Sequence, residues 1–223
     1  MPVRVSSTKS EQMKTLIIAL SLAGLALPAR ELPIAPDAPP RAGTTGYELV
    51  KKQGQVALYE RWLEVEPGRQ ARELKAEFIA PASPQALLEL LRDESKALAW
   101  MRHAGACRIL EDNDDGWLAY VRYDLPWPVS DQDCLLRYEL HKNGGSAKLG
   151  FRSASDSKAP PRRGVKRMAG VSGAWLLEPV AGGRSKVSYT VITTERPSLP
   201  RWITDPIVQG NLLDTMNAFL GQL

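Results

Sequence analysis

Residues that commonly perform catalysis are sparse in this sequence, and they lack the spacing that catalytic motifs need. His103 and His141 are the two histidines, and neither stands in a zinc-binding pattern such as H-E-x-x-H. The sequence contains no G-x-S-x-G nucleophile elbow, no phosphate-binding loop and no glycine-rich dinucleotide fingerprint. We therefore predict no catalytic residues, no metal site and no cofactor, and we expect a binding protein rather than an enzyme.

Two smaller groups of reactive side chains have simple interpretations. Residues 112–116 read Asp-Asn-Asp-Asp-Gly, but a calcium-binding loop needs alternating ligands over about 12 residues and a final glutamate, so a hairpin turn is predicted. The two cysteines, Cys107 and Cys134, fall on the first and third strands of a predicted meander. Such strands lie about 9–10 Å apart, whereas a disulfide needs roughly 4.4–6.8 Å between Cα atoms, so two buried thiols are expected.

The charge of the chain limits the class of partner. A net charge of +4 is compatible with an anionic membrane surface but too weak to indicate nucleic acid. The basic segment Pro160–Arg167 would suit anionic lipid headgroups, and a solvated loop with local counter-charges is the alternative. We expect a monomer that makes transient contact with an anionic membrane and has no nucleic-acid partner.

The N-terminal segment is typical of export. Lys14 precedes a mostly apolar run at 16–27, which is too short to span a bilayer. Residues 1–29 are therefore predicted to be a signal peptide, with Met13 as the suspected true start, and a buried helix is the alternative. A periplasmic or secreted location follows.

A proline-rich linker is predicted at 30–46, followed by one domain at 47–223. Ser83 and Pro84 provide the cap and the first position of a helix, a second short helix covers about 95–102, and a long amphipathic helix is predicted over 200–223. Alternating apolar residues predict strands at 55–63, 73–80, 107–110, 117–124, 134–142, 147–153, 165–179 and 186–194. Strands followed by one amphipathic helix indicate an α+β layer architecture.

Alternation along the strands separates an inner face from an outer face. The outer face of the 117–124 strand is predicted to hold Leu118, Tyr120, Arg122 and Asp124. The inner faces of two neighbouring strands are predicted to hold Trp117, Ala119, Val121 and Tyr123, and Cys134, Leu136, Tyr138 and Leu140. The apolar face of the last helix is predicted to comprise Ile203, Ile207, Leu212, Leu213, Met216, Phe219, Leu220 and Leu223.

The segment D-L-P-W-P-V-S-D-Q-D at 124–133 resembles the START family of steroidogenic-acute-regulatory-related lipid-transfer domains, in which a P-x-P-V-S-D-R-D-like stretch recurs. Other similar pieces follow the family order: 52–61, 75–80, Trp100 with 107–111, 173–179 with 186–190, and 198–203. The resemblance covers 47–223. It implies an exported bacterial member with a helix-grip fold, like that of Bet v 1, in which a curved antiparallel sheet wraps a long C-terminal helix around an elongated apolar cavity.

The sequence also departs from the family pattern. Gln132 stands where arginine is usual, and Glu195-Arg-Pro197 replaces an Asp-Pro-Gly-Gly-like turn. Some sterol-carrying members have a buried acid–arginine pair, and the matching positions here are Ala119 and Tyr138. The absence of that pair argues against a sterol ligand, although the Tyr138 hydroxyl could still donate a hydrogen bond.

The resemblance implies that the loop Leu125–Asp131 and the helix Trp202–Leu220 form a gate. Trp127, between two prolines, is expected to enter lipid headgroups or cover the pocket mouth, with a packing anchor as the alternative. The residues predicted to contact a ligand, for which core packing is the alternative, are Trp100, Ala119, Val121, Tyr123, Trp127, Leu136, Tyr138, Tyr189, Ile207, Leu212 and Met216.

The leading functional hypothesis is therefore non-catalytic binding or transport of a lipid or another hydrophobic small molecule. A polyketide cyclase-like enzyme on the same fold is one alternative, and it predicts inward-pointing acids, bases or arginines. A protein-binding module is the other, and it predicts a cavity filled by side chains and an exposed apolar patch.

Overall fold

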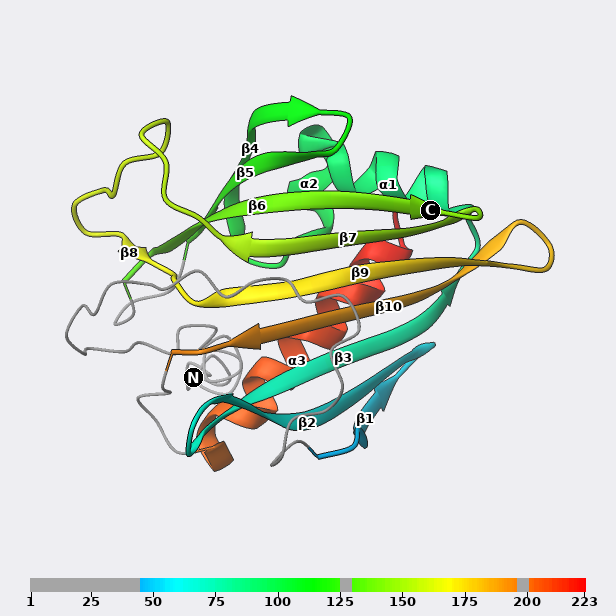
Figure 1. Ribbon diagram of the computed structural model, residues 1–223, viewed down its shortest axis with the longest axis horizontal. Helices are drawn as coiled ribbons and strands as arrows, with labels where there is room; N and C mark the ends of the chain where they lie inside the picture. Colours follow the sequence, from blue (N-terminus) through cyan, green and yellow to red (C-terminus); the bar gives the residue numbers. More distant parts are fainter. Residues whose placement is uncertain (1–44, 125–129, 196–200) are drawn as a thin grey trace, which may run out of the picture.

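A computed structural model describes residues 45–124, 130–195 and 201–223, without the side chains of 202–204. A ten-stranded sheet lies across the long helix α3 (Figure 1). Helix α2 packs against β4, and α1 packs against β7 and β9. The predicted α+β architecture, one sheet holding a C-terminal helix, is confirmed. The elements are β1 (Glu48–Gln53), β2 (Val56–Glu66), β3 (Arg69–Ala80), α1 (Pro84–Arg92), α2 (Glu94–Trp100), β4 (Ala104–Asn113), β5 (Gly116–Tyr123), β6 (Gln132–Asn143), β7 (Ser146–Ser153), β8 (Lys166–Arg167), β9 (Val171–Val180), β10 (Arg184–Thr193) and α3 (Arg201–Leu220).

The strands follow the order β1-β2-β3-β10-β9-β7-β6-β5-β4, and β8 pairs with β6 off this path. Every pair is antiparallel except β6–β8. The first and last parts of the sheet meet where β3 pairs with β10, so that Leu74 lies opposite Val191. This pairing places strands from both ends of the chain over α3 (Figure 1).

Local signals in the sequence explain where the elements begin and end. The Ser83 hydroxyl accepts a hydrogen bond from the Ala86 N–H at 3.3 Å, and Pro84 begins α1 as predicted. The 112–116 segment forms the hairpin turn between β4 and β5, where the Asp115 N–H donates to Asn113 Oδ1 at 3.0 Å. The predicted turn is therefore confirmed.

The main core lies between the inner face of the sheet and α3. Leu213, Met216 and Phe219 are fully buried along one side of the helix. The Phe219 ring packs against three aromatic rings with centroid distances of 5.1 Å to Trp100, 5.2 Å to Trp175 and 6.5 Å to Phe78. The predicted inner faces of β5 and β6 belong to this core.

The outer face of β5 is also buried, which the alternation did not predict. Leu118 and Tyr120 pack with Leu135 of β6 and Ala159 in a second hydrophobic cluster. The chain between β7 and β8 supplies Ala159, and so covers this side of the sheet. The prediction of one interior face was wrong for Leu118 and Tyr120, because a distant segment hides them from water.

Other sequence predictions were corrected by the structure. The strand at 165–179 is predicted to break at Gly170 and Gly173, and the structure divides it into β8 and β9 at Gly170, whose positive φ of 66° ends the extended conformation, while Gly173 lies within β9. Leu223, assigned to the apolar face of the last helix, lies beyond the end of α3 and is 42% exposed. Within the described ranges, no helix is both long and apolar enough to cross a membrane.

Candidate binding cavity

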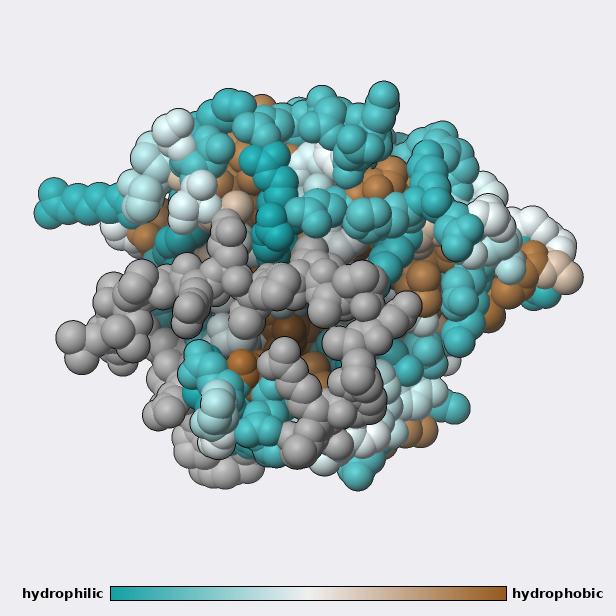
Figure 2. All heavy atoms as spheres, viewed as in Figure 1, coloured by the Kyte–Doolittle hydropathy of each residue, from teal (hydrophilic) through white to brown (hydrophobic). Residues whose placement is uncertain are grey.

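A cavity of about 240 Å³ lies between the sheet and α3, with walls formed mostly by apolar and aromatic side chains. Strands β3, β5, β6, β7, β9 and β10 supply one wall, the end of α2 supplies a second, and α3 supplies a third. On the face shown in Figure 2, most of the described surface is hydrophilic, with hydrophobic residues in patches between polar ones. A binding site for an apolar molecule fits these walls.

The structure brings most of the residues predicted to contact a ligand to this one cavity. Those that line it are Trp100, Val121, Tyr123, Leu136, Tyr138, Tyr189, Leu212 and Met216. Ala119 is buried in the core without lining the cavity, and Val208 lines it in place of its neighbour Ile207. Trp127, proposed to cover the mouth, lies outside the described residues, as do most of the loop 125–131 and the predicted signal peptide.

Sequence reasoning missed part of the wall. The additional lining residues are Leu74, Met101, Arg102, Gln132, Phe151, Met168, Trp175, Val191, Val208, Asn211 and Thr215. Phe151, Trp175 and Val191 lie on predicted strands, and their alternation could have placed them inside. Arg102 and Gln132 gave no hydrophobic signal, because charged and amide side chains are usually assigned to the surface.

Three tyrosines line the cavity with hydroxyl groups that no described residue bonds. Burial raises the pKa of Tyr123, Tyr138 and Tyr189 well above the ordinary value, so these phenols stay protonated at neutral pH. A protonated phenol donates one hydrogen bond. The cavity therefore offers hydrogen-bond donors within otherwise apolar walls.

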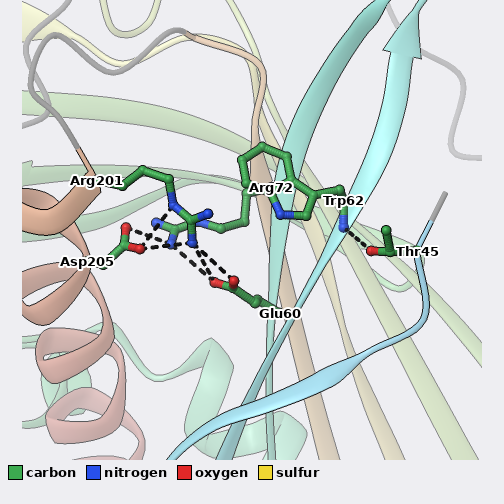
Figure 3. Close-up of polar contacts among 6 residues, drawn as sticks. All are labelled: Thr45, Glu60, Trp62, Arg72, Arg201 and Asp205. Carbon is green, nitrogen blue, oxygen red and sulfur yellow. Dashed lines mark hydrogen bonds and ion pairs between the residues drawn. The ribbon is translucent and has the colours of Figure 1, made fainter. Parts of the chain in front are cut away.

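A ring of four charges attaches the start of α3 to the sheet (Figure 3). The Arg72 guanidinium contacts Asp205 at 2.7 Å and Glu60 at 3.3 Å. The Arg201 guanidinium donates to the same two carboxylates, at 3.0 Å to Glu60 and 3.0 Å to Asp205. It also lies 5.0 Å above the Trp62 ring. The network joins β2, β3 and α3, so it fixes the helix that forms one wall of the cavity.

A buried ion pair holds the opposite side of the site. Asp133 of β6 is 1% exposed and accepts two hydrogen bonds from Arg167 of β8, at 2.6 and 3.1 Å. Arg167 also donates to the Ala159 carbonyl at 3.1 Å. This pair attaches the segment between β7 and β9 to β6. Gln132, the residue before Asp133 in β6, lines the cavity.

The basic segment 160–167 has partners of several kinds. Arg167 pairs with Asp133, Lys166 lies 3.9 Å from Glu195, and Arg162 lies 5.4 Å from the Tyr120 ring centroid. Local carboxylates therefore pair with two of the basic side chains of this segment, whereas Arg162 and Arg163 are exposed.

The two cysteines are free thiols, and the prediction that they are buried holds for Cys134, whereas Cys107 is half-buried. Val121 of β5 lies between them, opposite Cys107 of β4 on one side and Cys134 of β6 on the other. Burial raises the pKa of the Cys107 thiol to about 11 and that of the Cys134 thiol to about 12. Both sulfurs are therefore protonated at neutral pH.

We expect both thiols to resist alkylation in the folded protein at pH 8, because the thiolate is the reactive species and burial suppresses it. Mass spectrometry after iodoacetamide treatment should find unmodified native protein, and two alkylated cysteines after unfolding in guanidinium chloride. Rapid labelling of Cys134 without denaturant would contradict the buried-thiol assignment.

No cluster of three or more histidine, cysteine, aspartate or glutamate side chains in the described part of the chain has a geometry that could hold a metal ion.

Comparisons with known proteins agree with the architecture. No known family profile matches the chain. An uncharacterized protein of Pseudomonas aeruginosa is 26% identical over 133 residues, which are 59% of this chain and 65% of that protein, so the match spans less than two thirds of the relative. A STAR-related lipid transfer protein from Xanthomonas axonopodis superposes with a TM-score of 0.69 and 26% identity, covering 80% of this chain and 98% of that one.

More distant structures share the fold alone. Human STARD10 superposes with a TM-score of 0.65 and 17% identity, covering 79% of this chain and 72% of that one. The Zhui aromatase/cyclase from Streptomyces superposes with a TM-score of 0.50 and 16% identity, covering 68% of this chain and 93% of that one. The fold is thus shared by lipid-transfer domains and by an aromatase/cyclase.

Proposed function

We propose that this chain, which shares the fold of STAR-related lipid-transfer domains and is 26% identical to a bacterial one, is a non-catalytic carrier of a hydrophobic ligand. The observation that carries the proposal is the aromatic and aliphatic cavity between the sheet and α3. A lipid tail in that space would gain about 0.8 kcal/mol for each methylene removed from water. Few polar contacts are then needed for binding.

The alternative of an enzyme on the same fold predicts acids, bases or arginines at the cavity wall, and one arginine, the exposed Arg102, does line the cavity. The lining contains no carboxylate and no histidine among the described residues. Its tyrosines have pKa values raised by burial, which makes them hydrogen-bond donors and poor bases at neutral pH. These features favour a carrier over a cyclase-like catalyst.

The alternative of a protein-binding module needs an exposed apolar patch. The exposed large hydrophobic side chains of the described chain come from separate places: Leu49 of β1, Ile79 of β3, Leu98 of α2, Val180 of β9 and Leu223 after α3. The side chains between the sheet and α3 leave space rather than filling it. Both features favour a small ligand as the partner.

We place the carrier outside the cytoplasm, as a monomer without a nucleic-acid partner. The apolar run at 16–27 behind Lys14 supports export. The exposed side chains of Arg162 and Arg163 support transient contact with an anionic membrane from which a ligand is taken.

The proposal is tested by native mass spectrometry of protein purified without detergent, with lipid extraction of the same sample. We expect a stoichiometric hydrophobic ligand, or uptake of one from a lipid panel. An empty protein that takes up nothing from the panel would exclude the carrier function.

A variant whose side chain fills the cavity should lose ligand binding. Val208 of α3 lines the cavity, and Val208→Trp should occupy the space and reduce bound ligand at least about tenfold, while the helix stays folded. Val180→Trp adds the same side chain at the exposed end of β9 and should bind normally. Equal ligand loading of the two variants would place the ligand elsewhere.

A further inference from the structure

Gln132 is a buried polar side chain of the cavity without a partner among the described residues, and the buried Trp100 Nε1 and the three tyrosine hydroxyls of the wall are also unbonded there. The buried polar or charged residues are Glu73, Gln132, Asp133 and Ser185. Glu73 binds Arg61, Asp133 binds Arg167, and Ser185 donates to the Ala82 carbonyl. Gln132 is 4% exposed, lines the cavity, and forms no side-chain hydrogen bond to any of the described residues. A buried amide normally has such a bond, so this one is available to a ligand.

Two further donors lie near Gln132. Tyr123 lies directly opposite Gln132 in the β5–β6 pair, so the two side chains share the cavity face. Arg102 also lines the cavity. Its neighbour His103 accepts a hydrogen bond at its carbonyl from the N–H of Asp124, the residue after Tyr123, at 3.0 Å. This bond holds the backbones beside Arg102 and Tyr123 together. Arg102 forms no ion pair with any described residue. We call Arg102, Tyr123 and Gln132 the polar corner.

The polar corner suits a group that accepts hydrogen bonds and carries negative charge. A guanidinium has donors only, and the phenol and the amide each add donors. The corner contains a positive charge and no carboxylate, so a cationic group there would have no counter-ion. A carboxylate head meets both requirements.

The aromatic wall does not provide an equivalent site for a cation. Tyr138 stacks on Trp117 with a centroid distance of 4.8 Å and an interplanar angle of 18°, and Phe151 stacks on Tyr189 at 5.8 Å and 16°. Tyr138 also contacts Phe151 at 5.7 Å and Tyr189 also contacts Trp175 at 4.6 Å, so both tyrosine rings are flanked by two aromatic neighbours, whereas cation–π binding needs a free ring face. The wall instead presents an apolar surface that suits a hydrocarbon tail.

The cavity volume limits the number of tails. Its volume of about 240 Å³ lies below the roughly 300–1,000 Å³ of typical sites for drug-sized ligands. One hydrocarbon chain fits this space better than two.

We infer that the polar corner binds the carboxylate of a single-chain amphiphile, with the tail along the aromatic wall. This inference rests on the proposed carrier function and adds the chemistry of the ligand head. Gln132 supplies the buried contact, and Arg102, at the exposed end, supplies charge.

The test measures dissociation constants by titration calorimetry, below the micelle concentration, for three probes with the same tail: dodecanoate, dodecanol and dodecyltrimethylammonium. The wild-type protein should bind dodecanoate most tightly and the ammonium probe most weakly. Gln132→Met should weaken dodecanoate binding about tenfold because a hydrogen bond to a charged group is lost. Gln132→Glu, which keeps the shape and adds a repulsive charge, should weaken it further.

The variant Arg102→Gln measures the contribution of the Arg102 charge apart from that of the Gln132 amide. Dodecanoate binding should weaken roughly two- to fivefold, because an ion pair at an exposed position is worth little, and dodecanol binding should stay unchanged. Arg108→Gln removes an equally exposed charge that does not line the cavity and should change neither probe.

The possible failures are distinguishable. If the wild-type protein binds none of the three probes, the proposed function and this inference both fall. If it binds all three equally, or prefers the ammonium probe, the cavity binds tails but the assignment of the polar corner is wrong. Equal dodecanoate affinity in the wild type, Gln132→Met and Gln132→Glu would also overturn the assignment.

Discussion

Replacing Asp133 with alanine should lower the free energy of unfolding by about 3–5 kcal/mol, because the Arg167 charge would stay buried without its partner. The wild-type carboxylate is 1% exposed and accepts two hydrogen bonds from Arg167. Urea unfolding followed by circular dichroism would measure the change. Asp114→Ala, at the exposed tip of the β4–β5 turn, is the matched control and should stay within about 0.5 kcal/mol of wild type.

A double variant of the same pair shows whether the loss comes from the missing attraction or from the unpaired Arg167 charge. The double variant Asp133→Leu/Arg167→Met removes both charges, and it should recover much of the stability lost in Asp133→Ala. A loss below about 1 kcal/mol in Asp133→Ala would show that Arg167 reaches water when its partner is absent.

Phe219→Ala is the second change with a large expected effect. Phe219 is fully buried and contacts the rings of Phe78, Trp100 and Trp175. Truncation removes this apolar surface and leaves a void that rigid neighbouring rings fill poorly, so a loss of about 3–5 kcal/mol is expected.

Urea unfolding would also measure the Phe219→Ala effect. Leu223→Ala is the control, because Leu223 lies beyond α3 and is exposed, and it should change stability by less than about 0.5 kcal/mol. Similar losses in the two variants would mean that the end of α3 does not anchor the core.

The sequence predicts the sheet and the last helix well because both carry strong patterns. The inner residues of β5 and β6 alternate with their outer neighbours, and the buried side of α3 recurs at helical spacing. β1 was missed because five of its six residues are exposed and it borders β2 alone. An edge strand that buries little has no alternation to detect.

The wall of the cavity was predictable only in part. Tyr138 and Met216 were found because they lie on recognisable inner faces. Ile207 was chosen in place of Val208, because an apolar neighbour on either side leaves the rotation of the helix undetermined. Gln132 was noted as a departure from the family pattern, but its burial depends on the β5–β6 pairing and the neighbouring cavity, which the sequence alone does not reveal.

The β3–β10 pairing has a consequence for how the chain acquires its structure. Leu74 and Val191 lie opposite one another although more than a hundred residues separate them in the chain. Closing a loop of that size costs entropy before any contact across it is gained, so folding is slow relative to that of a helical bundle. The β2–β3 hairpin has an unpaired edge until β10 emerges from the ribosome or from a translocation channel. The order of synthesis therefore leaves one edge of β3 without its partner strand until the C-terminal part of the chain is made, and an unpaired edge favours aggregation.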